Sequence, residues 1–289
     1  MKKLIQGHQR FRESYVPYHV DQLEELSHGQ KPRVLFITCS DSRIDPNLIT
    51  QADIGELFII RNAGNIIPPY GAANGGEGAA VEYALNALDI RQIIVCGHSH
   101  CGAMKGLLQL GKLEEEMPLV YSWLKHSEAT RQLVKETYTQ YNGEELLEIT
   151  IAENVLTQIE NLKTYPIVHS RLYQRKLEIF AWVYHLETGE VLAFDPETHS
   201  YVPPQSQLSL REMGELVPGE FEKTGAPPVA CELLQRMPAA EHGSARSLEP
   251  MSQTVHAETA TAIDSIVETM PWLTPEQAER IYRGSVAQR

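Results

Sequence analysis

The sequence predicts an α/β fold: a mostly parallel β-sheet core flanked by helices, with an N-terminal helical arm and an extended C-terminal tail. Short runs of β-branched and aromatic residues at 33–38, 57–60 and 92–97 are typical of buried strands. A helical pattern separates the last two runs, which favours parallel pairing. Near Pro203 large apolar residues become sparse, and nine of the 17 prolines fall between 203 and 275, which indicates a tail with little core of its own.

The remaining elements follow in chain order. Amphipathic patterning predicts one or two helices across 2–27, and a glycine-rich loop at 68–78 precedes a helix at 79–88. Strand-like runs on either side of Glu187-Thr188-Gly189 predict a hairpin. Between these parts we expect four helices, at about 101–110, 117–125, 128–141 and 144–165. We divide the chain into an arm (1–29), a core (30–203), a linker of low order (204–270) and a C-terminal peptide (271–289).

Composition limits the class of protein. A formal net charge of -13 argues against a nucleic-acid partner, which would require a basic surface. No stretch is apolar for long enough to span a membrane, and the first residues lack the apolar core of a signal peptide, so we expect a cytosolic protein. The four cysteines, at 39, 96, 101 and 231, fit no disulfide framework.

Two of the predicted strands end in metal-ligand chemistry. Cys39 follows the first strand, and His98 and Cys101 follow the strand at 92–97. Two thiolates and an imidazole are the ligands that zinc takes in tetrahedral geometry, and a catalytic zinc keeps one position open. Either stretch alone could be ordinary packing, with small buried cysteines and a hydrogen-bonded histidine. Because both sets of candidate ligands directly follow the end of a predicted strand, a zinc site is the better interpretation.

Asp41 and Arg43 follow the first of these cysteines, and Asp41 has two possible roles. It can occupy the fourth zinc position and close the site. Alternatively, it can accept a bidentate hydrogen bond from Arg43, which leaves that position to water. The less specific alternative is a surface ion pair of little energetic consequence.

Taken together, these motifs resemble those of a known protein family. CSDSR followed by GHSHCG, with RNAGN and the glycine-rich loop between them, resembles the β-class carbonic anhydrases over residues 1–200. The resemblance implies one Zn²⁺ per subunit on Cys39, His98 and Cys101, with Asp41 and Arg43 as a catalytic dyad. It also implies a homodimer or a larger assembly of dimers, with the helical arms embracing the partner subunit.

The resemblance also implies substrate contacts. Gln30 stands where the plant-like branch has a hydrogen-bonding Gln in a site shared with the partner subunit, while Phe58 and Tyr83 match apolar pocket residues. The Gly102 amide would face the substrate. Phe36 stands where the bicarbonate-inhibited branch has Trp, which favours an open zinc site. For the three aromatic residues, core packing is the alternative.

The implied function is the reversible hydration of carbon dioxide to bicarbonate by zinc-bound hydroxide. Two alternatives remain: hydrolysis of carbon disulfide or carbonyl sulfide at the same site, and a non-catalytic carboxysome scaffold subunit. With its tail included, the chain resembles the cyanobacterial, carboxysomal type of the family. That type implies a place in the carboxysome and a scaffold partner with a γ-carbonic-anhydrase-like domain.

The C-terminal peptide supplies a candidate docking segment for that partner. A capping box at 274–277, with Pro275 at its first helical position, predicts a short helix. We expect partner contacts from the apolar side chains around it, which are Trp272, Leu273, Ile281 and Tyr282. The alternative is that this segment folds back onto its own catalytic core.

Overall fold

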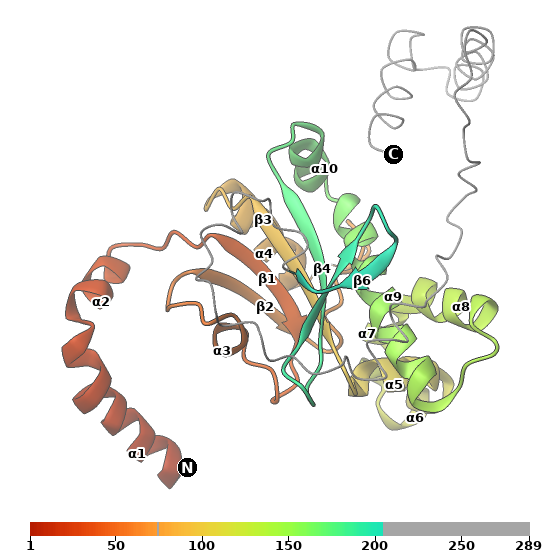
Figure 1. The fold of residues 1–289 in the computed structure, drawn as a ribbon, viewed down its shortest axis with the longest axis horizontal. Coiled ribbons are helices and arrows are strands. Elements are labelled where there is room, and N and C mark those ends of the chain that lie inside the picture. The colour runs from red at the N-terminus through yellow and green to blue at the C-terminus, as the bar shows by residue number, and fades with distance from the viewer. Residues whose placement is uncertain (74, 205–289) are drawn as a thin grey trace, which may run out of the picture. The chain divides into compact units, whose positions relative to one another are not determined.

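The computed structural model describes residues 1–73 and 75–204, so the predicted linker and C-terminal peptide lie outside the described residues, apart from residue 204. A six-stranded sheet with the order β2-β1-β3-β4-β5-β6 forms the centre of the described part (Figure 1). Strands β2, β1, β3 and β4 pair in parallel, whereas β5 and β6 are antiparallel. This arrangement confirms the mostly parallel α/β fold. The strands are β1 (Val34–Cys39), β2 (Leu57–Asn62), β3 (Gln92–His98), β4 (Glu178–Tyr184), β5 (Val191–Asp195) and β6 (Ser200–Val202).

Most of the core helices cover one face of the sheet, whereas α3 packs against the other face through Ile49. The long helix α9 packs against β3 and β4, and many of its side chains are buried (Figure 1). Gly97 of β3 permits this contact, because a Cβ there would lie 2.8 Å from a methyl group of Val155. The core helices are α3 (Pro46–Thr50), α4 (Gly76–Asn86), α5 (Gly102–Leu108), α6 (Leu113–Glu116), α7 (Pro118–Leu124), α8 (Glu128–Thr137), α9 (Gly143–Lys163) and α10 (Pro166–Tyr173).

The two faces of β1 bury different side chains, as the alternation along a strand requires. Leu35 and Ile37 belong to the main core beneath the helices, whereas Phe36 lies in a smaller cluster with Ile94 and Cys96. Because both faces are apolar, the strand reads as a continuous hydrophobic run, which is typical of a parallel sheet.

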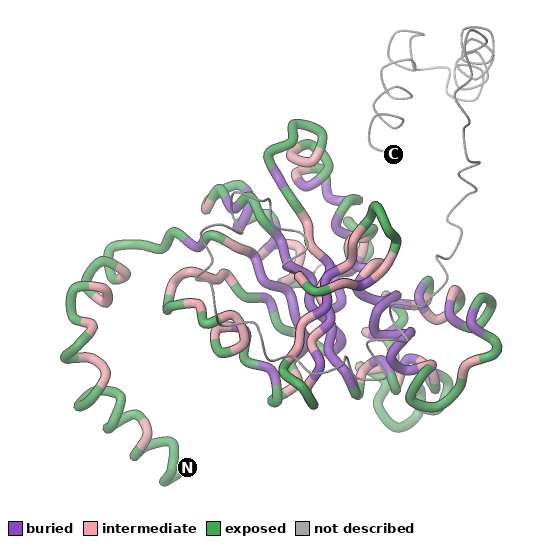
Figure 2. The backbone as a smooth tube through the Cα atoms, viewed as in Figure 1, coloured by how far each residue is buried: buried purple, intermediate pink, exposed green. Residues whose placement is uncertain are grey.

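The N-terminal arm is helical, as predicted. It consists of α1 (Lys2–Arg10) and α2 (Val20–Ser27), joined by a π-helical turn at Phe11–Tyr15 and a 3₁₀ turn at Val16–Tyr18. Neither α1 nor α2 has a buried residue, and Figure 2 shows the arm almost wholly exposed. Large apolar side chains such as Leu4 and Tyr18 therefore face solvent in the single chain.

Several predicted boundaries were wrong. The helix expected at 79–88 begins at Gly76, inside the segment that we expected to be a loop. Gly78 lies close beneath the ring of Tyr165, so this glycine serves close packing. The helices expected at 101–110 and 128–141 end earlier, at Leu108 and Thr137.

Among the strands and α-helices of the described residues, four were not predicted: α3, α6, α10 and β6. Pro46 and Pro166 stand in the first turn of α3 and α10, where a missing N–H costs nothing, so a start signal was present in the sequence. The hairpin was predicted correctly, since β4 pairs antiparallel with β5 around the turn that contains Gly189. Within the described part of the chain, no helix is long and apolar enough to cross a membrane.

Candidate active site

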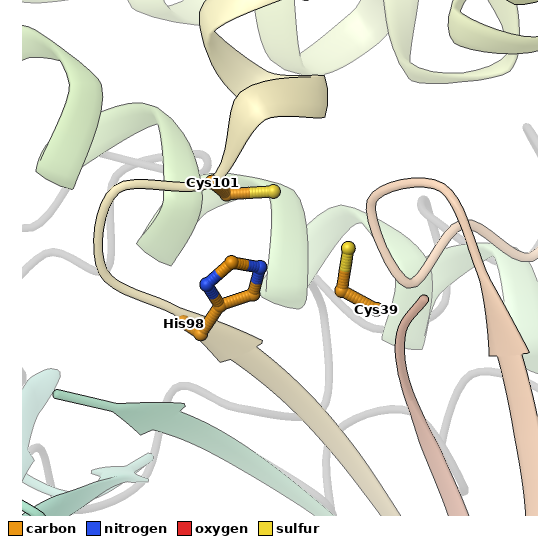
Figure 3. A group of neighbouring side chains, drawn as sticks. All are labelled: Cys39, His98 and Cys101. Carbon is orange, nitrogen blue, oxygen red and sulfur yellow. The ribbon is translucent and has the colours of Figure 1, made fainter. Parts of the chain in front are cut away.

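The three predicted zinc ligands converge at the carboxyl end of the sheet (Figure 3). Cys39 is the last residue of β1, His98 is the last residue of β3, and Cys101 immediately precedes α5. One ligand atom from each lies within 4.8 Å of the others, and all three residues are buried. Adjacent parallel strands end at the same edge, which is why two distant sequence motifs meet here.

The imidazole of His98 is in the tautomer that a metal requires. Its Nδ1 lies 2.8 Å from the carbonyl oxygen of Ser99, and because a carbonyl only accepts hydrogen bonds, Nδ1 carries the proton. Nε2 therefore presents a lone pair to the cluster. This buried atom has no hydrogen-bond partner among the described residues, although it lies 3.9 Å from Asp41 Oδ2. Such an orphaned acceptor beside two sulfurs fits a metal ion.

The sulfur of Cys39 is held in the form that binds metal. Hydrogen bonds from the Cys101 thiol and the Gly64 amide lower the pKa of Cys39 to about 4, against the opposing effect of burial. The thiolate is therefore its stable form at neutral pH. The same hydrogen bond raises the pKa of Cys101, because its thiol donates to the Cys39 thiolate, and burial and the repulsion between two negative sulfurs act in the same direction. A divalent cation would remove this repulsion, so the donor set fits zinc.

Asp41 and Arg43 form the predicted dyad. The guanidinium donates from Nε to Asp41 Oδ1 at 2.9 Å and from Nη2 to Oδ2 at 2.7 Å, and the Arg43 amide donates to Oδ1 at 3.0 Å. These contacts hold the pKa of Asp41 well below its usual range. The carboxylate thus accepts the bidentate hydrogen bond from Arg43 that the second predicted role requires, while it lies beside the ligand cluster.

Arg61 of β2 holds the backbone of the Cys39–Asp41 turn, a role that was not predicted. Its Nε donates to the carbonyl oxygen of Cys39 at 3.1 Å and its Nη2 to that of Asp41 at 2.7 Å. Arg61 is the first residue of the RNAGN motif, so the sequence contained a motif that points to it. Its contacts with the Cys39–Asp41 turn could not be predicted, because they depend on the pairing of β1 with β2.

Within a single chain, only some of the predicted substrate residues lie near the three ligands. Gly102, the first residue of α5, adjoins Cys101, and its N–H has no acceptor within the helix. Phe58 and Tyr83 contact each other, with ring centroids 6.0 Å apart. However, Phe58 pairs with Leu35 near the start of β1, at the opposite end from Cys39. Gln30 is exposed and precedes β1, so the length of that strand, about 20 Å, separates it from the ligands.

Phe36 and Cys96 lie outside the ligand cluster. Phe36 is fully buried and packs edge-on against Trp182, with ring centroids 6.2 Å apart. Cys96 is also fully buried in the middle of β3, where the lack of solvation raises the pKa of its thiol to about 12. It therefore behaves as a small apolar residue. The fourth cysteine, Cys231, lies outside the described residues.

An unpredicted acidic cluster surrounds the turn between the two ligands of the second motif. His100 adopts a left-handed conformation, with φ of 53°. Its ring pairs with Glu187 and with Glu144, its amide donates to Glu148 at 3.4 Å, and its carbonyl accepts from Arg43 Nη2 at 3.2 Å. Burial lowers the pKa of His100, but these carboxylates outweigh that effect and raise it. These glutamates come from α9 and the β4–β5 turn, so sequence spacing could not reveal them.

Comparison with known proteins identifies the class. Residues 34–191, more than half of the chain, match the family model for carbonic anhydrase. A solved structure described as that of the β-carbonic anhydrase CcaA superposes with a TM-score of 0.70 and 65% identity, covering 71% of this chain and 99% of the other. A tetrameric β-carbonic anhydrase from Sordaria macrospora, at 24% identity and a TM-score of 0.59, shares the fold.

The chain therefore belongs to the β-carbonic anhydrases, a family of zinc-dependent lyases. Among its relatives are cyanobacterial enzymes: the carbonic anhydrase of Synechocystis is 54% identical over 286 residues, which covers 99% of this chain and 100% of that protein. The carbonic anhydrase of Synechococcus elongatus is 53% identical over 287 residues, with the same coverage. Both alignments extend through the C-terminal tail.

Proposed function

We propose that this chain hydrates carbon dioxide reversibly at a zinc ion held by Cys39, His98 and Cys101, with Asp41 and Arg43 as its catalytic dyad. The observation that carries the proposal is the convergence of three buried ligand atoms within 4.8 Å beside a carboxylate already paired with arginine. Zinc would act as a Lewis acid that makes a coordinated water acidic near neutral pH, an effect for which carbonic anhydrase is itself the usual example.

The dyad would orient the reacting water. Asp41 Oδ2 stands 3.9 Å from His98 Nε2, and from there it would accept a hydrogen bond from the reacting water or hydroxide. Arg43 holds the carboxylate ionised through two hydrogen bonds from its guanidinium, and this pairing would leave the fourth coordination position to water. The Gly102 N–H, at the start of α5, would donate to a substrate oxygen.

The rest of the substrate pocket would come from a second subunit. Gln30, Phe58 and Tyr83 lie toward the other end of the sheet, so a dimer in which the partner supplies them would complete the site. The exposed apolar side chains of α1 and α2 support such a dimer, because they need to be covered. Larger assemblies of dimers would use the same interface.

We place the enzyme in the carboxysome, where it would convert bicarbonate to carbon dioxide for fixation. The similarity to two cyanobacterial carbonic anhydrases along their whole length, tails included, supports this placement. In this proposal residues 1–29 form the dimerising arm, 30–203 the catalytic core, 204–270 a linker and 271–289 a docking peptide for the scaffold protein with a γ-carbonic-anhydrase-like domain.

The site assignment is tested with ligand variants. Cys39→Ala, His98→Ala and Cys101→Ala should each lose zinc, measured by metal analysis, and nearly all carbon dioxide hydration, measured by stopped flow with a pH indicator. Cys96→Ala is the matched control, because it removes an equally buried thiol outside the cluster and should keep both. Stoichiometric zinc in all three ligand variants would overturn the assignment. The same assay with carbon disulfide tests the alternative substrate.

A further inference from the structure

The loop that follows β2 carries a direct contact to the metal cluster. The backbone N–H of Gly64 donates to the Sγ atom of Cys39 at 3.4 Å. Gly64 has a φ of +80°, and a Cβ at this position would lie 2.7 Å from Cε of Met104 and 3.1 Å from the Ala103 methyl. The peptide therefore fits tightly between β1 and α5, the elements that hold Cys39 and Cys101, and only glycine allows that fit.

A row of amide side chains on α9 holds this loop. Asn154, Gln158 and Asn161 share one face of the helix at a spacing of four and three residues. Asn154 Nδ2 donates to the Gly64 carbonyl at 3.0 Å, Gln158 Oε1 accepts from the Ile67 amide at 2.9 Å, and Asn161 Nδ2 donates to the Ile67 carbonyl at 2.9 Å. The loop backbone is thus hydrogen-bonded to a helix whose position is set by the core.

The backbone N–H of Ile67 determines how the side-chain amides of Gln158 and Asn154 are oriented. The Ile67 N–H can only donate, so the oxygen of Gln158 must face it and the nitrogen of Gln158 must face Asn154. The oxygen of Asn154 therefore receives the Gln158 N–H at 2.9 Å, together with the Ser127 hydroxyl at 2.9 Å. The nitrogen of Asn154 is left to face Gly64. Asn154, Gln158 and Ser127 are fully buried, so water cannot replace these bonds.

We propose that Asn154 is a positioning residue for the zinc site: by binding the Gly64 carbonyl it holds the N–H of the same residue against the Cys39 sulfur. This inference rests on the proposed zinc site and extends it to the shell behind the ligands. An N–H that donates to a thiolate withdraws electron density from the sulfur and makes it a weaker donor to the metal and a weaker base. Asn154 thereby influences both the retention of the metal and its electron-accepting power.

Cobalt substitution tests the proposal without relying on activity. A Co²⁺ ion bound by thiolates shows a sulfur-to-metal charge-transfer band, whose energy falls when a hydrogen bond to the sulfur is lost. In the cobalt-substituted protein, Asn154→Ala should move this band to longer wavelength. In the zinc protein, the same variant should release zinc to a chelator about tenfold faster, because losing the fixed loop beside Cys39 outweighs the stronger donation of its sulfur.

A second variant covers the case in which Asn154→Ala does not fold. Asn154→Asp keeps the size of the side chain and the acceptor used by Ser127 and Gln158. At about pH 9, where a carboxyl group is ionised, it also replaces the donor facing Gly64 by an acceptor. The charge-transfer band should shift in the same direction as in Asn154→Ala.

The matched control is Tyr138→Phe. It removes a buried hydrogen bond of 2.6 Å to Glu153, the neighbour of Asn154 on α9, without touching the loop. It should lower thermal stability and leave the band in place. An unmoved band in both Asn154 variants, or an equal shift in Tyr138→Phe, would overturn the inference. A wild-type protein that binds cobalt without any charge-transfer band would instead refute the thiolate ligands, and with them the proposed function.

Discussion

At the residue scale, the side chains of the site differ in the hydrogen bonds that they already make. Asp41 accepts three hydrogen bonds from Arg43, whereas His98 Nε2 has no hydrogen-bond partner among the described residues. The two groups are neighbours, yet one is occupied and the other is free to bind a cation. In the proposed mechanism, this difference separates the metal ligand from the acceptor that orients water, although a carboxylate and an imidazole can both bind zinc.

The dyad can be tested by removing either member. Asp41→Asn keeps the shape of the side chain but loses the charge that accepts the hydrogen bond of water, and Arg43→Ala frees Asp41 to approach the metal. We expect both variants to retain zinc while the turnover number falls about a hundredfold or more. Metal analysis and stopped-flow hydration measure the two quantities. Turnover at the wild-type level in both variants would show that the pair is only structural.

Because Cys96 is buried as a neutral thiol, we expect the protein to lose stability at alkaline pH. Burial raises the pKa of its thiol from 9.0 in the unfolded chain to about 12 in the folded chain. Below pH 9 the thiol is neutral in both states and the unfolding free energy does not depend on it. Between about pH 9 and 12 only the unfolded chain releases the proton, so the unfolding free energy decreases as pH rises.

Denaturant unfolding measured at several pH values between about 9 and 12 tests this prediction. Cys96→Ala should show a smaller decrease between about pH 9 and 12 than the wild type, while its unfolding free energy at neutral pH is lower because of the cavity. A residual slope is expected, since burial also raises the pKa values of Tyr138 and Tyr201. Identical slopes in variant and wild type would contradict the buried-thiol explanation.

At the scale of elements, the site depends on how closely α9 packs on the sheet. The helix places Asn154 against the loop after β2 and Glu148 against the His100 turn. Its close approach depends on Gly97, where a Cβ would lie 2.8 Å from Val155 and 3.1 Å from Ile151. A shift of α9 would therefore disturb both sides of the ligand cluster.

Gly97→Ala tests this packing. We expect it to lower the unfolding free energy by about 1–3 kcal/mol, the usual cost of an extra methyl group in a packed core. The control is Gly111→Ala, because a Cβ at Gly111 meets nothing within 4 Å. Thermal or denaturant unfolding of both variants compares them. Equal stability of the two would mean that β3 and α9 can separate without cost.

The sequence predicted the parallel strands, the hairpin and the ligand motifs, because each depends on residues adjacent in the chain. Cys39 and His98 could be recognised from the strands that they end. The supporting residues could not be found in this way. Asn154 reaches Gly64 across 90 positions, and Ser99 reaches Glu187 across 88. Such pairs are determined by how helices and turns pack on the sheet, and a single sequence contains no periodic signal for them.

At the scale of the whole molecule, one chain contains the ligand cluster and the dyad but exposes surfaces that indicate assembly. The arm has apolar side chains without cover, and Gln30 lies far from its own metal cluster. A dimer would resolve both features, since the arm would be covered and the pocket completed in the same step. In the proposed function the catalytic core and the tail would have separate tasks, and truncation of the chain tests this division.

The tail is the last feature to test, and its role is argued from sequence. The capping box at 274–277 and the apolar residues Trp272, Ile281 and Tyr282 predict a short helix with an aromatic face. A helix this short is marginal alone in water, so it needs a partner's groove or its own core to pack against. The full-length similarity to two cyanobacterial carbonic anhydrases supports a task for this segment beyond the fold of the core.

Truncation after Met270 should therefore leave carbon dioxide hydration at the wild-type level and abolish binding to the carboxysomal scaffold protein. Trp272→Ala and Tyr282→Ala should each weaken that binding by about 2 kcal/mol, as for aromatic residues at the centre of an interface. Stopped-flow hydration and a pull-down with the scaffold's γ-carbonic-anhydrase-like domain measure the two effects. Because the catalytic assay is run on the same truncated protein, loss of binding cannot be attributed to misfolding of the core. Undiminished scaffold binding after truncation would move the docking surface onto the catalytic core.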